Sequence, residues 1–560
     1  MMIRRLSTTG LVSIGALLLS SCDKDKAGDE EVRLVLQITV DGLRGDFLEL
    51  HKDQLGPDGF RRLMNSGVHF TNAHYHHANT ETVVGHSTLA TGAPPAVHGM
   101  IGNAWYDRRS GQLGYNFEDA GFPLLKTRET TAEVAELDPS KQGVRSNGRS
   151  PGRLLAPTFS DTLRLATDGE AKVFAVSGKD RGAIPMAGQG GKAFWFSTSS
   201  TDFVTSEYYY EDYPEWTKSW NGKRLAEAYA DTEWELSGEP GDYRRIAHDE
   251  RAYEVDLGGF KRSFPHPYGP ANHPLFPTRL LTSSAGDELV ADFAATLLEA
   301  EELGKDGTPD FLAVSFSSVD AVNHFFGPGS LECEETLRQL DRTLAEFLKK
   351  VDQVVGLDRT LVVLSADHGM PVMPEYAVEI GFPAGRLQPQ EVVDAANAAA
   401  SELGVEDAVK TFFRPYLYLD HEAIIESGVD KSKLLEQVTA AIEDIEGVRL
   451  AVASDTPPSD APRSRISSNH HPDRSGDVYV AQEPYWFLFD KGPVACMHGS
   501  PWSYDTHVPV IFSGPRLSRQ QVGRSMRPAD IAPSLSAALG LGPPAMATGE
   551  ILEELGGSNP

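Results

Sequence analysis

The sequence predicts an α/β fold in which a central, mostly parallel β-sheet lies between helices and carries two inserted subdomains. Short, apolar, β-branched runs recur along the chain, and amphipathic helical segments separate them. This alternation breaks at residues 190–280 and 371–494, which we interpret as an aromatic-rich cap insertion and a small α+β insertion. Both lie within one predicted domain, residues 32–560, which is long enough to bury a large core.

The N-terminal segment predicts export. Residues 1–21 hold two arginines, a short apolar run and small residues before Cys22, a pattern typical of a secretory signal and too short for a bilayer-spanning helix. The segment resembles a bacterial lipoprotein signal, which implies a lipidated Cys22 and a charged tether over residues 22–31. We therefore expect a periplasmic protein of the bacterial envelope that meets the membrane only through its lipid. A soluble periplasmic protein with an unlipidated cysteine is the alternative.

Charge and cysteine content exclude several classes of protein. The formal charge of −29 becomes −31 when the two leader arginines are removed, and such an acidic surface repels nucleic acid and anionic lipid. We expect small-molecule substrates, no nucleic-acid partner and a monomer. Beyond the leader only Cys333 and Cys496 remain, too few for a disulfide scaffold, and they either pair or stay as buried thiols.

The first predicted strand, residues 32–40, runs directly into Asp41. Ligands of open α/β sheets bind at the carboxyl ends of the strands, so this carboxylate is a candidate site residue. Residues 79–92 follow as a polar loop that meets an apolar run of small residues, which predicts a short helix with Thr82 at its N-cap.

A hydroxyl at the start of this helix lies where backbone N–H groups attract an anion. Thr82 can attack a phosphorus or sulfur centre only if its proton is removed, and the stretch holds no lysine or cysteine to do so. A metal ion is the expected source of that help. An ordinary helix cap is one alternative. A metal-free nucleophile at Ser87 is another, but the closing glycine of the G-x-S-x-G motif is missing.

Three polar side chains further along suit phosphate binding. Asn103 lies in a glycine-punctuated loop and can donate to an oxyanion. The segment 111–157 has no helical or strand periodicity in its hydrophobic residues, which predicts a long surface loop. A strand at 172–177 then leads to Lys179 and Arg181, which we expect to alternate across an extended turn and point the same way. Ordinary solvated surface charge is the alternative for this pair.

The next two strands end at candidate metal ligands. After the strand at 310–316, Asp320 and His324 stand one helical turn apart and form a plausible half-site for zinc. The strand at 361–365 ends at Asp367 and His368.

A late histidine completes the inventory. His498 follows the second insertion in a His-Gly pair, and His507, which opens the next strand, is its alternative. The insertion that precedes it has a helix, strand, helix, strand pattern at 392–403, 416–419, 431–445 and 448–452. Six ligands from separate parts of the chain match two zinc ions that share a phosphate, namely Asp41, Asp320, His324, Asp367, His368 and His498.

The order of these motifs resembles the alkaline phosphatase superfamily over almost the whole mature chain. The motifs are a strand ending in Asp, a Thr before Val-Val-Gly-His, a Gly-x-Asn loop, Lys-x-Arg, Asp-x-x-x-His, Asp-His-Gly and a late His-Gly. Within the superfamily the combination is most similar to the phosphate-irrepressible alkaline phosphatases of bacterial envelopes. The resemblance implies an alkaline-phosphatase-like sandwich fold and hydrolysis of phosphate monoesters.

The resemblance also implies roles for individual residues. One zinc ion would be held by Asp320, His324 and His498, and the other by Asp41, Asp367, His368 and the Thr82 oxygen. Thr82 would form a phosphothreonine intermediate, while Asn103, Lys179 and Arg181 would hold the phosphoryl oxygens. Because the lysine stands where some relatives place a third metal ion, no magnesium is expected.

Rival functions leave different marks in the sequence. Sulfatases need a C/S-x-P-x-R element, and none of the three cysteines is so placed. Nucleotide pyrophosphatases and phosphodiesterases share the metals and the threonine, but are not expected to carry the Lys-x-Arg pair. A non-catalytic envelope lipoprotein that binds phosphorylated ligands would lack a ligand or the nucleophile, and here all are present.

Overall fold

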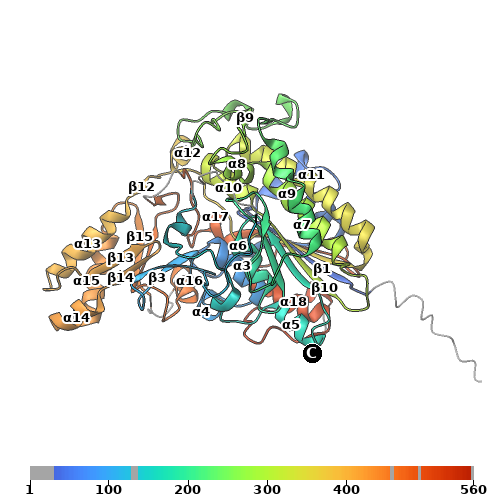
Figure 1. The fold of residues 1–560 in the computed structure, drawn as a ribbon. Coiled ribbons are helices and arrows are strands. Elements are labelled where there is room, and N and C mark those ends of the chain that lie inside the picture. The colour runs from blue at the N-terminus through green and yellow to red at the C-terminus, as the bar shows by residue number, and fades with distance from the viewer. Residues whose placement is uncertain (1–30, 128–136, 455–459, 490–493, 557–560) are drawn as a thin grey trace, which may run out of the picture.

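The computed structural model describes residues 31–127, 137–454, 460–489 and 494–556 (Figure 1). The predicted signal peptide, the candidate lipidation site Cys22 and nearly all of the tether lie outside these ranges. Within them, no helix combines the length and the apolar character needed to cross a bilayer.

A nine-stranded sheet forms the centre of the described chain, in the order β19-β2-β18-β11-β1-β10-β5-β6-β7. Its middle strands β11, β1, β10, β5 and β6 are parallel neighbours, whereas β18 is antiparallel to both β11 and β2. The strands are β1 (Leu34–Val40), β2 (Val68–His74), β5 (Val173–Ser177), β6 (Lys192–Phe196), β7 (Phe203–Val204), β10 (Asp310–Phe316), β11 (Thr360–Ser365), β18 (His507–Ser513) and β19 (Gln520–Val522). The predicted α/β class with a mostly parallel sheet is confirmed.

Helices cover both faces of this sheet (Figure 1). One group packs together as α3 (Thr82–Thr91), α5 (Phe159–Ala166), α6 (Asp180–Ala187) and α18 (Ile531–Ala538). The other comprises α9 (Ser284–Ala300), α10 (Ser318–Phe326) and α11 (Leu331–Val354). Since strands β1, β10 and β11 are buried along their whole length, their apolar, β-branched sequences are those that a sheet covered on both faces requires.

Two local predictions near the site need correction. Thr82 is the first residue of α3, and Glu81, whose backbone is extended, takes the N-cap position that we expected for Thr82. The extended turn predicted for Lys179 and Arg181 is wrong, because α6 begins at Asp180. Lys179 is the extended N-cap residue of that helix, with its N–H bonded to the Ser177 hydroxyl at 3.0 Å, and Arg181 lies in the first turn.

The first residues of the predicted cap insertion, 190–280, belong to the central sheet and are not part of a separate unit. Its first part supplies β6 and β7, which form one edge of the central sheet. The aromatic side chains there pack against α9, with Phe203 stacked on Phe293 at a centroid distance of 4.1 Å and Trp220 edge-on to Phe293 at 5.2 Å. Burial of these rings against a helix of the main core explains the aromatic richness of the segment.

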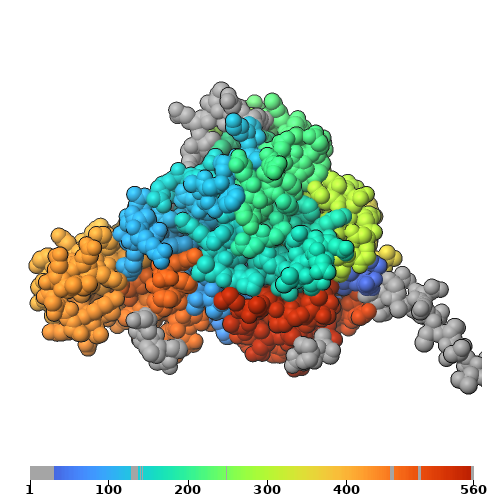
Figure 2. Space-filling view, turned by 60° about the horizontal axis from the view of Figure 1, so that its bottom comes forward, coloured from blue at the N-terminus to red at the C-terminus, as the bar shows by residue number. Residues whose placement is uncertain are grey.

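The predicted insertion at 371–494, which we call the inserted unit, holds an antiparallel sheet of its own in the order β13-β14-β16-β15. These strands are β13 (Val409–Phe413), β14 (Tyr416–Leu419), β15 (Val448–Ala453) and β16 (Val478–Gln482). Helices α13 (Pro389–Ser401), α14 (His421–Ser427) and α15 (Lys431–Glu443) belong to the same unit, and α13 and α15 pack on each other. A separate apolar cluster fills it, and Figure 2 shows part of the unit as a lobe beside the main body.

Cys333 and Cys496, the two cysteines of the described chain, are buried and unbridged. Of the two possibilities left open by the sequence, buried thiols are therefore confirmed. Burial raises the pKa of Cys333 to about 12 and raises that of Cys496 as well.

The contact between α3 and the end of β11 predicts a strict requirement for glycine at position 85. A Cβ at Gly85 would lie 2.0 Å from the carbonyl oxygen of Asp367. Gly85→Ala should therefore lower the free energy of unfolding by about 1–3 kcal/mol, as overpacking of a core does. Gly222→Ala is the control, since nothing lies within 4 Å of its Cβ. Denaturant unfolding of the two variants measures the difference, and equal stability would contradict the close contact.

Candidate active site

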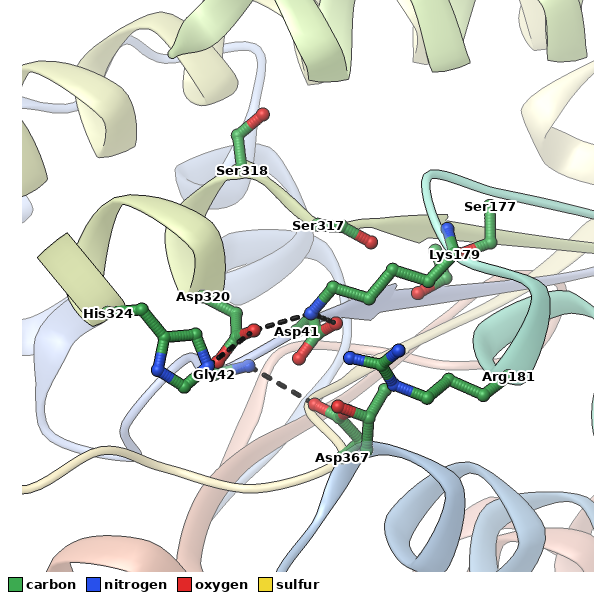
Figure 3. Close-up of polar contacts among 12 residues, drawn as sticks. Asp41, Gly42, Ser177, Lys179, Arg181, Ser317, Ser318, Asp320, His324 and Asp367 are labelled. Carbon is green, nitrogen blue, oxygen red and sulfur yellow. Dashed lines mark hydrogen bonds and ion pairs between the residues drawn. The ribbon is translucent and has the colours of Figure 1, made fainter. Parts of the chain in front are cut away.

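Three neighbouring strands of the central sheet deliver acidic residues to one edge. β1 ends before Asp41, β11 before Asp367, and β10 leads into α10, which carries Asp320. The parallel register places Val40 opposite Phe316 and Thr39 opposite Ser365, so the three strands end side by side. Figure 3 shows the three carboxylates gathered at this edge.

Histidines complete two overlapping groups of potential metal ligands in the described chain. One group is Asp320, His368 and His498, and the other is Asp41, Asp367 and His368. Within each group the ligand atoms lie within 4.8 Å of one another, and all these residues are buried. His324 adjoins the first group, because its Nε2 lies 3.3 Å from Asp320 Oδ2. The structure thus brings together all six candidate ligands, with His368 in reach of both groups.

Several polar atoms at the centre of the cluster make no hydrogen bond, although ion pairs link the three carboxylates to His86, His368 and His498. Among the described residues, no hydrogen bond reaches these buried atoms: Asp41 Oδ1, Asp320 Oδ1, Asp367 Oδ2, His368 Nε2 and Thr82 Oγ1. Buried polar atoms without hydrogen bonds are costly, and bound cations would satisfy the carboxylate and imidazole atoms of this set. Carboxylate oxygens and imidazole nitrogens are also the donors that zinc prefers, so the residues fit two zinc ions.

Backbone carbonyls orient the three candidate histidine ligands. Nδ1 of His324 donates to Cys496 O at 2.9 Å, that of His368 to Gly369 O at 2.8 Å, and that of His498 to Thr80 O at 2.7 Å. This fixes the tautomer and directs each Nε2 toward the carboxylates, as outer hydrogen bonds do for metal-binding histidines.

His507, the alternative to His498, belongs to neither ligand group. Its Nε2 lies 3.0 Å from Thr71 O, and its ring stacks on His74 with centroids 4.7 Å apart. This imidazole therefore has a structural environment at the start of β18.

Lys179 balances part of the negative charge. Its ammonium group donates to Asp41 Oδ2 at 2.7 Å and to Asp320 Oδ2 (Figure 3). Burial opposes the charge, but the two carboxylates outweigh it and raise the pKa of Lys179. In the same way, Asp367 and Asp41 overcome the burial of His368 and raise its pKa to about 10. The cluster thus favours positive charge strongly at its centre.

Arg181 also points toward the acid cluster in Figure 3, but its partners differ from those of Lys179. Its Nη1 lies 2.5 Å from Asp138 Oδ2 and 3.4 Å from the Tyr115 hydroxyl. Burial disfavours its charge, but Asp138, Tyr115 and Asp180 together more than compensate, and the pKa of Arg181 is raised. Asp138 lies in the aperiodic segment 111–157, where no sequence pattern indicates this contact.

The candidate nucleophile lies at the start of α3, next to a prepared amide. The Thr82 hydroxyl is buried, and Asn103 Oδ1 accepts a hydrogen bond from Val83 N at 3.0 Å. With its oxygen so engaged, the Asn103 amide offers its NH₂ group as a donor. The adjacent cavity of about 900 Å³ is lined by Asn103, Lys179, Arg181 and His498, among others.

His86 was missed, although it lies in the Val-Val-Gly-His motif. Its Nδ1 is 2.9 Å from Thr82 O and 3.1 Å from Asp367 Oδ2, and its Nε2 is 2.9 Å from Ser315 Oγ. It therefore ties the first turn of α3 to a candidate metal ligand. The neighbouring Ser87 hydroxyl has no hydrogen-bond partner within the described residues, so no base is in place to activate it.

Comparisons with known proteins agree with this geometry. A family model described as type I phosphodiesterase / nucleotide pyrophosphatase matches residues 35–505. The chain is 31% identical over 520 residues to a protein of Myroides odoratus named calcium-transporting ATPase, covering 90% of this chain and 91% of that one. It is also 31% identical over 533 residues to alkaline phosphatase PhoV of Synechococcus elongatus, covering 93% and 92%.

A solved structure shows the same architecture. The crystal structure of wild type alkaline phosphatase PafA superimposes with a TM-score of 0.83 and 28% identity, covering 94% of this chain and 99% of that chain. The alkaline-phosphatase-like fold implied by the motif order is thereby confirmed.

The different environments of the two late histidines predict different effects on metal content. His498→Ala should lower bound zinc by about one equivalent per chain, because an open three-ligand site loses one of its protein ligands. His507→Ala should leave the zinc content unchanged. Elemental analysis of both purified variants measures this, and loss of zinc from His507→Ala alone would contradict the assignment.

Proposed function

We propose that this chain, which belongs to the type I phosphodiesterase and nucleotide pyrophosphatase family of the alkaline phosphatase superfamily, is a zinc-dependent phosphate monoester hydrolase with Thr82 as its nucleophile. The observation that carries the proposal is the buried cluster of carboxylates and imidazoles, which forms two groups of potential metal ligands. This cluster adjoins α3, whose first residue Thr82 has a buried hydroxyl without a hydrogen bond. The solved relative named alkaline phosphatase, which covers nearly the whole chain, supports the same reaction.

We assign the six candidate ligands and the Thr82 oxygen to two proposed zinc sites, with His368 in one of them only. Asp320, His324 and His498 would hold one ion, and Asp41, Asp367, His368 and the Thr82 oxygen the other. Bound zinc lowers the pKa of a coordinated alcohol and stabilises the charge on the leaving oxygen. The three backbone carbonyls behind the histidines keep their Nε2 atoms available for this role.

The protein groups would act on the substrate in two steps. The Thr82 oxygen attacks the phosphorus atom while the bond from phosphorus to the ester oxygen breaks, which releases the alcohol and leaves phosphothreonine. Water then attacks the same phosphorus, frees inorganic phosphate and restores the Thr82 hydroxyl. The Asn103 amide and the Arg181 guanidinium donate hydrogen bonds to the phosphoryl oxygens during both steps.

Lys179 would serve as a fixed cation beside the phosphoryl group. Its contacts with Asp41 and Asp320 support the idea that it stands where some relatives place a third metal ion, so we propose two zinc ions and no magnesium. Asp138 holds Arg181 in the cavity before substrate arrives.

A phosphodiesterase is the second candidate, because the family model carries that description. The relatives named alkaline phosphatase and the paired cations Lys179 and Arg181 favour the monoester. A monoester dianion has more charge for these cations to neutralise than a diester has.

We also propose a cellular location, a substrate class and an oligomeric state for the enzyme. The signal-like residues 1–21 and Cys22 support a lipid-anchored enzyme of the bacterial envelope. The strong negative charge supports small-molecule monoesters as substrates and argues against nucleic acid. We propose a monomer, since the ligands and the nucleophile all come from one chain.

Metal analysis together with a substrate panel tests the reaction. The purified chain should hold about two zinc ions and cleave an aryl phosphate faster than an aryl phosphodiester, ATP or an aryl sulfate. A chelator should abolish turnover and added zinc should restore it. Full activity after exhaustive chelation would contradict the metal-dependent mechanism. Faster cleavage of the diester than of the monoester would support the phosphodiesterase.

The paired cations should set the choice between monoester and diester. Charge-assisted hydrogen bonds are worth about 1.5–3 kcal/mol each, so losing them costs roughly ten- to a hundredfold or more in rate. The Lys179→Ala, Arg181→Ala variant should lose far more monoesterase than diesterase activity and keep its zinc. Lys218→Ala, Arg463→Ala removes two surface cations as the control. Equal loss on both substrates, with zinc retained, would show that the pair does not select the substrate.

A further inference from the structure

One arginine of the inserted unit reaches into the active site. Arg414 lies in the turn between β13 and β14, far along the chain from the nucleophile. Its Nη2 is 3.2 Å from Glu81 Oε1, and its Nη1 donates to the carbonyl oxygen of His498 at 2.7 Å. Both side chains of the Arg414–Glu81 ion pair are only 8% exposed, so this is a buried pair within the cavity wall.

Glu81 connects this arginine to the reacting groups. It is the N-cap residue of α3 and directly precedes Thr82. Its other carboxylate oxygen accepts a hydrogen bond from Asn103 N at 2.5 Å. A single buried ion pair therefore touches the start of the nucleophile's helix, the loop of the phosphate-binding amide and the backbone of a proposed zinc ligand.

The loop around His498 is shaped to receive the guanidinium group. Gly499 has a φ of +108°, and a Cβ there would lie 2.9 Å from Arg414 Nη1. Any other residue at this position would both strain the backbone and displace the arginine.

We propose that Arg414 is a positioning residue that makes the inserted unit part of the catalytic site. By pairing with Glu81 and holding the His498 carbonyl, it fixes Thr82, Asn103 and His498 relative to one another. The inference rests on the proposed function, since those three residues matter through that reaction. It adds a role in catalysis for residues 371–494, which have a sheet and an apolar cluster of their own and also pack on the main core through Tyr416, Tyr418 and Tyr479.

Two arginine variants separate this role from simple attachment of the inserted unit. Arg414→Met removes the charge and keeps the length, and Arg108→Met is the matched control. Arg108 also bridges to the inserted unit, with its Nη2 2.7 Å from Asp477 Oδ2, but does not line the cavity. We expect Arg414→Met to lower kcat for an aryl phosphate by about 10- to 100-fold with little change in KM, because small displacements of reacting groups have costs of that size. Arg108→Met should retain wild-type kcat.

Three further measurements exclude a general loss of folding. Arg414→Lys, which restores the charge without the fork, should recover part of the lost kcat. In a double-mutant cycle, Glu81→Gln should make Arg414→Met less damaging, because no buried carboxylate is then left unpaired. Zinc release to a chelator, followed with a zinc-sensitive dye, should be faster in Arg414→Met than in Arg108→Met, since only the former loosens the His498 backbone.

The outcomes distinguish this inference from the proposed function. A wild-type chain that hydrolyses no phosphate ester overturns the proposed function itself. An active wild type in which Arg414→Met matches Arg108→Met in kcat and zinc release overturns the role of Arg414 alone. Additive effects of Glu81→Gln and Arg414→Met would likewise show that the pair does not act as a unit.

Discussion

The rest of the structure depends on the mutual repulsion of three buried carboxylates. Asp41, Asp320 and Asp367 lie together at strand ends, out of water. Lys179 donates to Asp41 and Asp320, and His368 is paired with Asp41 and Asp367. Such an assembly is stable only if cations bind there or protons are taken up, which is what the raised pKa of His368 expresses. Parallel pairing of β1 with both neighbours forces the carboxylates together, so the sheet itself creates the demand for positive charge.

The elements around the carboxylates hold the imidazole groups and helix α3 in fixed positions next to them. Backbone carbonyls point the imidazoles inward, His86 ties α3 to Asp367, and Gly85 allows α3 to approach the end of β11. None of these contacts touches a substrate, yet each limits how far the central groups can move. Rigid support of this kind is what distinguishes a reactive cluster from an accidental collection of polar residues.

Much of the fold and of the site was predictable from sequence, for local reasons. Apolar, β-branched runs identify buried strands, and strand ends carry ligands, so Asp41, Asp320 and Asp367 could be placed without coordinates. The missed contacts depend on long-range packing. Asp138 comes from an aperiodic segment, and Arg414 reaches the site only through the placement of the whole inserted unit. The sequence did not show that the aromatic run after residue 190 begins with two strands of the central sheet, because a sheet edge that packs on a helix and a separate cap share the same composition.

Burial of the two thiols lowers their reactivity toward oxidants and toward other thiols. Sulfur reacts with oxidants and with other thiols mainly as thiolate, and burial, which raises the pKa of Cys333 to about 12, keeps this side chain in the thiol form at neutral pH. Cys496 is held by a hydrogen bond from its Sγ to Pro371 O, while its own carbonyl orients His324. Burial therefore makes both thiols poor partners for crosslinking or oxidation, including Cys496 next to the candidate metal ligand His324.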